Sequence, residues 1–248
     1  MTVVEGSTPA RVGSVWRCTV HVADRIAAAY IKPVPVYQIV REVLCALIAQ
    51  DVGLPALRPG VVLVEDTPLS EHGRYAFGTL ATDTRELQGM RDDTVLRSQL
   101  ARWQHMALAV AFDEWIANSD RTPSNLLFRG ASQFVLIDHG EAIPADLPPD
   151  GASTTNLLAR LAYSDVSRDE EFAAVRRVQN AATAFSRVNM AAIENASLAG
   201  SWDPDAMLPE CCRLLTDRLP HLPDLIAQRF GDPQRNLPMQ PRRGTTRP

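Results

Sequence analysis

The N-terminal part of the chain reads as short strands in which apolar and polar positions alternate. Residues 26–32 read as a strand returning from an earlier one at residues 15–22, and Pro33 then ends the ladder of hydrogen bonds. The earlier strand places four apolar side chains on one face, the two-residue period of a half-buried strand: Trp16, Cys18, Val20 and Val22. Residues 61–65 and 75–80 predict two further strands, so we expect an antiparallel sheet here.

A helical period interrupts these strands over residues 36–51, and Gly53 ends the segment. The apolar side chains at helical spacing are Val36, Ile39, Val40, Val43, Leu44 and Leu47. Glu42 lies off this stripe, in a row with Ala46 and Ala49, whose small side chains permit close approach of a neighbouring element. An ordinary solvated glutamate is equally compatible with this position.

Helical patterns dominate the chain beyond a polar stretch at residues 80–92, where the sequence changes from strand-rich to helix-rich. A long apolar face predicts one helix over residues 95–116. Further helices are expected near residues 154–163, 169–198 and 204–219.

Local signals mark two boundaries near the C-terminus. Asp203 followed by Pro204 fits the N-cap and the first position of the helix expected there. Residues 232–248 are proline-rich, basic and without periodicity. We therefore expect a disordered tail at these residues.

Composition limits the classes of protein to which the chain can belong. Apolar residues make up 46% and charged residues 22% of its 248 residues, as in ordinary globular proteins, and no apolar run is long enough to span a bilayer. The formal charge of −4 argues against general nucleic-acid binding, which needs a concentrated basic surface. The cysteines lack metal-ligand spacing and are expected to be reduced. The N-terminus carries no secretory signal, so a cytoplasmic location is expected.

Lysine occurs once in this chain. Of the 25 basic residues, Lys32 is the one lysine and the rest are arginine. Arginine is a wide planar fork, whereas the lysine ammonium is a compact charge that reaches between two phosphates. Either Lys32 fills a site that needs an ammonium, or it is a chance survivor on a strand.

Two aspartates and an asparagine are expected to meet at the open end of a hairpin. Residues 126–128 and 134–137 are short apolar segments around a turn, so they should pair as strands. Asn125 and Asp138 then face each other across the roughly 5 Å between strands. Asp120, five residues before Asn125, is expected to bring a second carboxylate to the same open end of the hairpin.

Such a set of oxygen ligands suits Mg²⁺. It also suits phosphoryl transfer, in which metal ions neutralise the phosphates while a separate carboxylate orients the acceptor hydroxyl. Taken alone, residues 120–125 are equally a common turn sequence, and residues 138–140 a common strand exit.

Together, these residues resemble the catalytic elements of protein-kinase-like enzymes. Asp120 and Asn125 have the internal spacing of the HRDxxxxN catalytic loop, and the sequence DHG at residues 138–140 is similar to the DFG element. With Arg121 after the aspartate, the amino-acid sequence of these two elements is most similar to that of HipA-like kinases and their phosphoinositide-kinase and actin-fragmin-kinase relatives. The resemblance spans roughly residues 5–165.

The resemblance implies ATP and Mg²⁺ as cofactors and a role for each matching residue. Lys32 would contact the α- and β-phosphates and Glu42 would hold it, while Asp120 would be the catalytic base. Asn125 and Asp138 would bind Mg²⁺.

A phosphate-covering loop is expected before the first strand. Gly6, Ser7 and Thr8 stand where such kinases place that loop, although one glycine beside two hydroxyl residues is common in any N-terminal segment. The sequence lacks a full GxGxxG loop and an APE motif. It also lacks the histidine that kinases have two residues before the catalytic aspartate; Asn118 occupies that position. HipA-like relatives lack these features too.

The implied fold is α+β and two-lobed. Residues 1–85 would form a small antiparallel-sheet lobe with one helix, residues 86–231 a larger helical lobe with the catalytic loop, and residues 232–248 the tail. The implied reaction transfers the γ-phosphoryl group of ATP to a hydroxyl, in the first place that of serine or threonine in a protein. A small-molecule or lipid kinase and a nucleotide-binding pseudokinase module are the alternatives. The sequence assigns no nucleic-acid partner and no oligomeric state.

Overall fold

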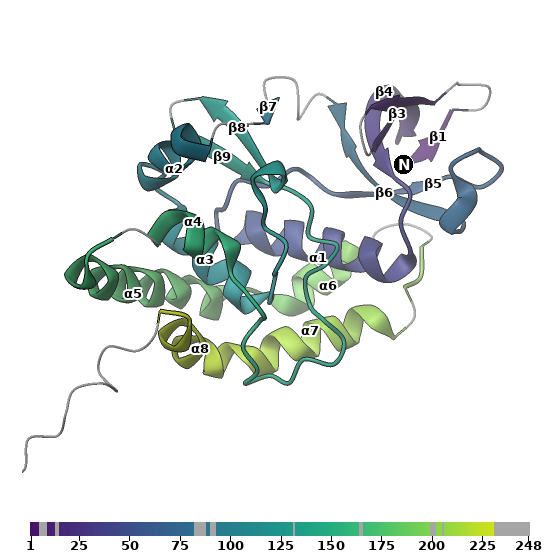
Figure 1. Cartoon of the computed structure of the whole chain (residues 1–248). Coiled ribbons are helices and arrows are strands. Elements are labelled where there is room, and N and C mark those ends of the chain that lie inside the picture. The colour runs from purple at the N-terminus through teal and green to yellow at the C-terminus, as the bar shows by residue number, and fades with distance from the viewer. Residues whose placement is uncertain are drawn as a thin grey trace, which may run out of the picture.

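The computed structural model describes residues 1–4, 9–12, 15–81, 88–89, 93–130, 132–163, 166–198, 202–204 and 206–230. These residues combine strands and helices in a mixed α+β fold, as the sequence predicts. In Figure 1 the larger sheet lies at the upper right, a smaller sheet at the upper left, and most helices lie below them. The tail expected at residues 232–248 lies outside the described residues.

Six strands of the described chain form the larger sheet, in the order β1-β5-β6-β4-β3-β2. Their bounds are β1 Thr2–Val3, β2 Ala10–Val12, β3 Val15–Val22, β4 Arg25–Lys32, β5 Gly60–Leu63 and β6 Tyr75–Leu80. β1 pairs antiparallel with β3 and parallel with β5, so it closes the curved sheet around an apolar cluster of its own. The expectation of a purely antiparallel sheet is therefore wrong at β1, whose two residues are too few to show a period.

The pairing of β3 with β4 decides which side chains of the sheet face inward. The two strands pair antiparallel along nearly their whole length. Ala29 and Ile31 of β4 are fully buried in the cluster inside the sheet. Because side chains alternate along a strand, Tyr30 and Lys32 lie on the opposite face, where they line a pocket.

The helix α1 (Val36–Asp51) begins and ends where the sequence predicts. Its apolar stripe joins the cluster formed by the other helices, and α1 lies above α7 in Figure 1. The row of Glu42, Ala46 and Ala49 is buried as well, and Glu42 is only 1% exposed. The alternative of a solvated Glu42 is thereby excluded.

Seven more α-helices appear among the described residues, and the longest predicted ones are interrupted. They are α2 Asp93–Ala101, α3 Met106–Trp115, α4 Leu157–Tyr163, α5 Arg168–Ala182, α6 Met190–Ser197, α7 Met207–Arg218 and α8 Leu222–Arg229. In the part of the chain with assigned positions, none combines the length and apolar character needed to cross a membrane.

The single helix expected at residues 95–116 is wrong, because the chain turns between α2 and α3. The amides of Arg102 and Trp103 donate to carbonyls three residues earlier, and the next helix starts at Met106. The Trp103 ring is buried edge-to-face against Phe134, 5.5 Å between centroids. Tertiary packing thus overrides a continuous apolar period that contains no proline or glycine.

The helix expected at residues 169–198 is also divided. A 3₁₀ segment, Thr183–Arg187, follows α5, and its Phe185 stacks on Trp115 with ring centroids 4.7 Å apart. Asn189 then caps α6 through its side-chain oxygen. The expected N-cap at Asp203 is wrong, since α7 starts only at Met207.

A second sheet carries the hairpin expected from the sequence. Its strands, within the described residues, are β7 Gln88–Gly89, β8 Leu126–Gly130 and β9 Gln133–Leu136, in that order. Gly130 has a φ of 95° in the turn, a conformation that favours glycine. The loop after α1 docks on this hairpin, because the Leu136 amide donates to the Pro55 carbonyl at 2.8 Å.

Candidate active site

Lys32, Glu42 and Asp138 meet at one wall of the pocket between the two sheets. The Lys32 Nζ lies 3.1 Å from Glu42 Oε1 and 2.7 Å from Asp138 Oδ1. The three side chains come from the end of β4, the middle of α1 and the segment after β9, so three separate elements build this contact. The sequence-predicted pairing of Lys32 with Glu42 is present in the structure.

The charge of Lys32 is stabilised in this position. Burial acts to lower the pKa of its ammonium, but the attraction of Glu42, together with Asp138, outweighs burial and raises the pKa. Glu42 is held from a second side, since the His139 backbone amide donates to its Oε2 at 2.8 Å. Glu42 therefore fixes both the ammonium and the start of the segment after β9.

Asp120 and Asn125 come together through the loop that precedes β8. A short 3₁₀ turn, Pro123–Asn125, brings the Asn125 amide back to donate to the Asp120 carbonyl, with Asp120 Oδ2 at 3.4 Å. The Asp120 side chain is exposed, whereas Asn125 is buried and lines the pocket. Asp120 thus lies beside Asn125 at the open side of the site.

The expected alignment of Asn125 opposite Asp138 is wrong by one residue. Leu126 pairs with Leu136, and the Ile137 amide donates to the Asn125 carbonyl at 3.2 Å, so Asn125 lies opposite Ile137. β9 ends at Leu136, and Asp138 leaves the strand direction with a φ of 60°. Both side chains still line the same pocket.

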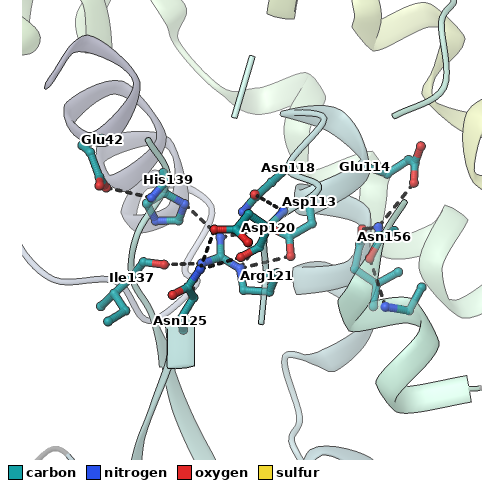
Figure 2. Close-up of polar contacts among 12 residues, drawn as sticks. Glu42, Asp113, Glu114, Asn118, Asp120, Arg121, Asn125, Ile137, His139 and Asn156 are labelled. Carbon is teal, nitrogen blue, oxygen red and sulfur yellow. Dashed lines mark hydrogen bonds and ion pairs between the residues drawn. The ribbon is translucent and has the colours of Figure 1, made fainter. Parts of the chain in front are cut away.

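Arg121 forms a buried polar centre behind this site, with no exposed surface on its side chain. Its Nε lies 3.1 Å from Asp113 Oδ2 and its Nη2 lies 3.1 Å from Asp113 Oδ1. Its Nη1 donates to the carbonyls of Asn125, just before β8, and Ile137, just after β9. Arg121 therefore ties helix α3 to both segments that carry the candidate metal ligands (Figure 2).

His139 completes a continuous network from Lys32 to Asp120. Arg121 Nη2 lies 2.9 Å from His139 Nδ1, and because arginine can only donate, we assign the imidazole hydrogen to Nε2. Burial, with the positive charges of Arg121 and Lys32, holds the pKa of His139 well below its usual range, so the ring is neutral. Among the described residues its Nε2 has no hydrogen-bond partner.

Asn118 links the far end of this network to the loop that carries Asp120. Its Nδ2 donates to Asp113 Oδ1 at 3.4 Å, and its Oδ1 accepts the Asp120 amide at 3.0 Å. The position where kinases place a histidine thus holds a residue that positions the Asp120 backbone. Figure 2 shows the resulting chain of contacts from Glu42 through His139 and Arg121 to Asp120.

A second buried carboxylate on α3 serves the packing of the helices. Glu114 accepts from Asn156 at 3.3 Å and from Arg229 at 2.9 Å, which links α3 to the segment before α4 and to α8. In Figure 2 this pair of Glu114 and Asn156 lies apart from the Arg121 centre. The neighbouring acids Asp113 and Glu114 therefore have different surroundings.

The pocket itself has a volume of about 460 Å³ and is partly apolar. Its apolar walls come from β3, β4, β6, the loop after α1 and the hairpin: Val15, Tyr30, Leu57, Phe77, Leu127 and Leu136. Its polar end holds Lys32, Glu42, Asn125 and Asp138. An apolar slot that ends in an ammonium and oxygen ligands suits a flat base carrying phosphates.

The donor set at the polar end fits Mg²⁺. The Asp138 side chain is 37% exposed, and the Asn125 amide oxygen accepts one hydrogen bond among the described residues, from Ser124 Oγ at 3.4 Å. Hard oxygen ligands of this kind hold Mg²⁺ together with substrate phosphates and water, without an all-protein cage. The described residues contain no group of three or more histidine, cysteine or acidic side chains able to enclose a metal.

Two further expectations concern residues away from this network. Gly6, Ser7 and Thr8, proposed as a phosphate-covering loop, lie outside the described residues. The four cysteines are free thiols, as expected: Cys18, Cys45, Cys211 and Cys212.

Comparisons with known proteins bear on the same residues. The family model for HipA-like kinase matches residues 29–188. No curated protein sequence matches the chain. Among solved structures, the proinflammatory kinase CtkA of Helicobacter pylori has a TM-score of 0.55 at 12% identity, over 94% of this chain and 99% of CtkA, which shows a shared fold.

HipA of Shewanella oneidensis MR-1, solved with HipB and operator DNA, is a more distant match. Its TM-score is 0.44 at 10% identity, over 90% of this chain and 65% of HipA.

Proposed function

Because the chain belongs to the HipA-like kinase family, we propose that it transfers the γ-phosphoryl group of ATP to a serine or threonine hydroxyl of a protein, with Mg²⁺ as the metal. The observation that carries this proposal is the meeting of Lys32, Glu42 and Asp138 at the polar end of one pocket. Phosphoryl transfer needs little covalent chemistry from the protein, so positioning and charge neutralisation are the main tasks of such a site.

Lys32 supplies the fixed positive charge of the proposed site. Its ammonium is anchored by the nearly fully buried Glu42, and the Lys32 side chain is 24% exposed and lines the pocket. A compact ammonium of this kind binds oxygens of the α- and β-phosphates while Glu42 holds it in place. The apolar walls around Tyr30 and Phe77 receive the adenine base.

Asp138 and Asn125 are the residues that would hold Mg²⁺, which, when bound, neutralises charge on the phosphate oxygens. Asp120 orients the acceptor hydroxyl and accepts its proton, as an exposed carboxylate beside Asn125 can. The backbone of Asp120 is fixed by Asn118, so the carboxylate starts from a defined position.

We further propose that residues 1–85 act as a small lobe and residues 86–231 as a large one. The apolar cluster within the larger sheet supports a separate small lobe. α1 belongs to the small lobe by sequence, yet its apolar stripe packs with the helices. Glu42 on α1 would therefore transmit the packing of the large lobe to Lys32. A cytoplasmic location and the lack of a nucleic-acid partner stay predictions.

Protection of Lys32 by nucleotide tests ATP binding directly, because the chain contains one lysine. We expect ATP with Mg²⁺ to slow acylation of Lys32 by an amine-reactive ester at least about fivefold, since phosphate oxygens would cover the ammonium. Peptide mass spectrometry gives the extent of labelling, with the terminal amine of Met1 as the internal control.

Adenosine at the same concentration is the matched ligand control and should protect Lys32 less than ATP does. Equal labelling of Lys32 with and without saturating ATP would contradict the proposal that ATP binds in this pocket. Loss of labelling at Met1 as well would indicate consumption of the reagent, and a fresh dose then restores the comparison.

A further inference from the structure

Three arginines converge on a second hollow, behind the wall of the pocket that holds Lys32. This hollow has a volume of about 430 Å³, and its lining includes Arg25, Arg58 and Arg129. The three residues come from the start of β4, the loop after α1 and strand β8. They lie far apart in the sequence, so the fold rather than a local basic run brings their charges together.

Among the described residues, the side chains of these arginines make no polar contact that holds the fold together. Within the part of the chain that the structure describes, no hydrogen bond or ion pair involves their side chains, and no acidic residue lines the hollow. Elsewhere the chain uses arginine structurally: Arg218 donates to the carbonyls of Trp115, Glu114, Pro148, Pro149 and Gly151. Arg25, Arg58 and Arg129 are all exposed, so their guanidinium groups remain available to a ligand.

The chemistry of the hollow selects an anion with several acceptor oxygens. A guanidinium presents a rigid fork of donors that matches phosphate oxygens two at a time. A phosphate monoester carries about −1.5 to −2 charges near neutral pH and three such oxygens, enough for more than one arginine. The formal net charge of the whole chain is −4, so the positive charge gathered at the hollow is opposite in sign to the net charge of the protein.

We propose that this arginine hollow is a binding site for a phosphate monoester group, separate from the nucleotide site. Leu57 lines both the hollow and the pocket of Lys32, so the two sites would share one wall formed by the loop after α1. The phosphate group could belong to a small molecule or to a phosphorylated side chain of a protein, which share the chemistry that the hollow recognises.

Arginine side-chain NMR on the full chain tests this proposal at the residues concerned. Inorganic phosphate, O-phosphoserine and a phosphoserine peptide are each titrated at constant ionic strength, and the Nε–Hε signals are assigned from single Arg→Gln variants. We expect saturable shifts of the Arg25, Arg58 and Arg129 signals. Peptide binding at least about tenfold tighter than O-phosphoserine identifies a protein ligand, and equal affinity identifies a small molecule.

The triple variant Arg25→Gln, Arg58→Gln, Arg129→Gln should bind phosphoserine at least about tenfold more weakly. The matched control changes three exposed arginines elsewhere, Arg160, Arg176 and Arg187, to glutamine and should bind as the wild type does. The proposal would be overturned if the Nε–Hε signals of the three arginines shifted no more with phosphate than with chloride. An equal loss of phosphoserine affinity in both triple variants would overturn it too. The readout requires no phosphoryl transfer, so it stands apart from the kinase proposal.

Discussion

Changing Asp120 to asparagine should lower the rate of phosphoryl transfer by about 10²–10⁴-fold, the contribution typical of a positioned general base. The Asp120 side chain is exposed, and its backbone amide is fixed by Asn118 Oδ1 at 3.0 Å. The asparagine has the same shape but cannot accept the proton of the acceptor hydroxyl. Initial rates of label transfer from ATP measure the effect, and the unfolding temperature should stay within about 2 °C of the wild type.

Asp169 offers a matched control for that experiment. It is an exposed aspartate in the first turn of α5, and Asp169→Asn removes the same charge from a part of the chain outside the site. We expect Asp169→Asn to keep the wild-type rate. An Asp120→Asn protein with a kcat within about threefold of the wild type would remove Asp120 from the role of base.

Changing Arg121 to leucine should cost about 3–5 kcal/mol of the free energy of unfolding, because it leaves the Asp113 carboxylate buried without its partner. Neither side chain has exposed surface. Burial already raises the pKa of Asp113 against the pull of Arg121, which indicates how poorly this site solvates a lone carboxylate. Urea-induced unfolding followed by circular dichroism measures the loss.

A double-mutant cycle separates the ion pair from the rest of the network. Asp113→Asn with Arg121→Leu removes both charges, so the double variant should lose at least about 1 kcal/mol less than the sum of the single variants. Strictly additive losses would mean that Asp113 and Arg121 are not energetically coupled. The 3.1 Å contacts between them would then be incidental.

The contact of Lys32 with Glu42 was expected from the resemblance to kinases, and each of the two residues belongs to a regular local element. Lys32 ends a strand with a clear alternation, and Glu42 falls on a defined row of a helix whose bounds the sequence predicts. Asn125 and Asp138 likewise flank a hairpin built from adjacent segments of the chain. Local patterns therefore predicted the element that carries each residue, whereas the resemblance implied that Lys32 and Glu42 meet in the same pocket as Asn125 and Asp138.

The buried network behind the site could not be predicted from the same patterns. Its contacts join Asp113 on α3 to Arg121 and His139, which depends on how helix and hairpin pack. One signal was present in the sequence: Asp113 and Glu114 interrupt an apolar helix between Phe112 and Trp115, and acids on a buried helix must be paired. Such acids in α3 indicate buried ion pairs even where their partners are unknown.

The register of the hairpin shows a second limit of prediction. A strand end predicted one residue too late changes which side chains are expected to lie opposite each other. Here the predicted partner of Asn125 was Asp138, whereas the observed partner is Ile137. The left-handed φ of Asp138 is a property of the folded chain that residue types alone do not specify. The elements that carry these residues were thus easier to predict than the geometry between them.

Transfer of label from γ-labelled ATP by the wild-type chain tests the central claim most directly. The chain is incubated with ATP and Mg²⁺, Asp120→Asn serves as the blank, and label is followed into protein, small molecules and free phosphate. We predict transfer to serine or threonine hydroxyls by the wild type and at least about 100-fold less by Asp120→Asn. ATP that protects Lys32 from acylation yet yields no labelled product and no free phosphate with the wild type would contradict the claim that this chain is an active kinase.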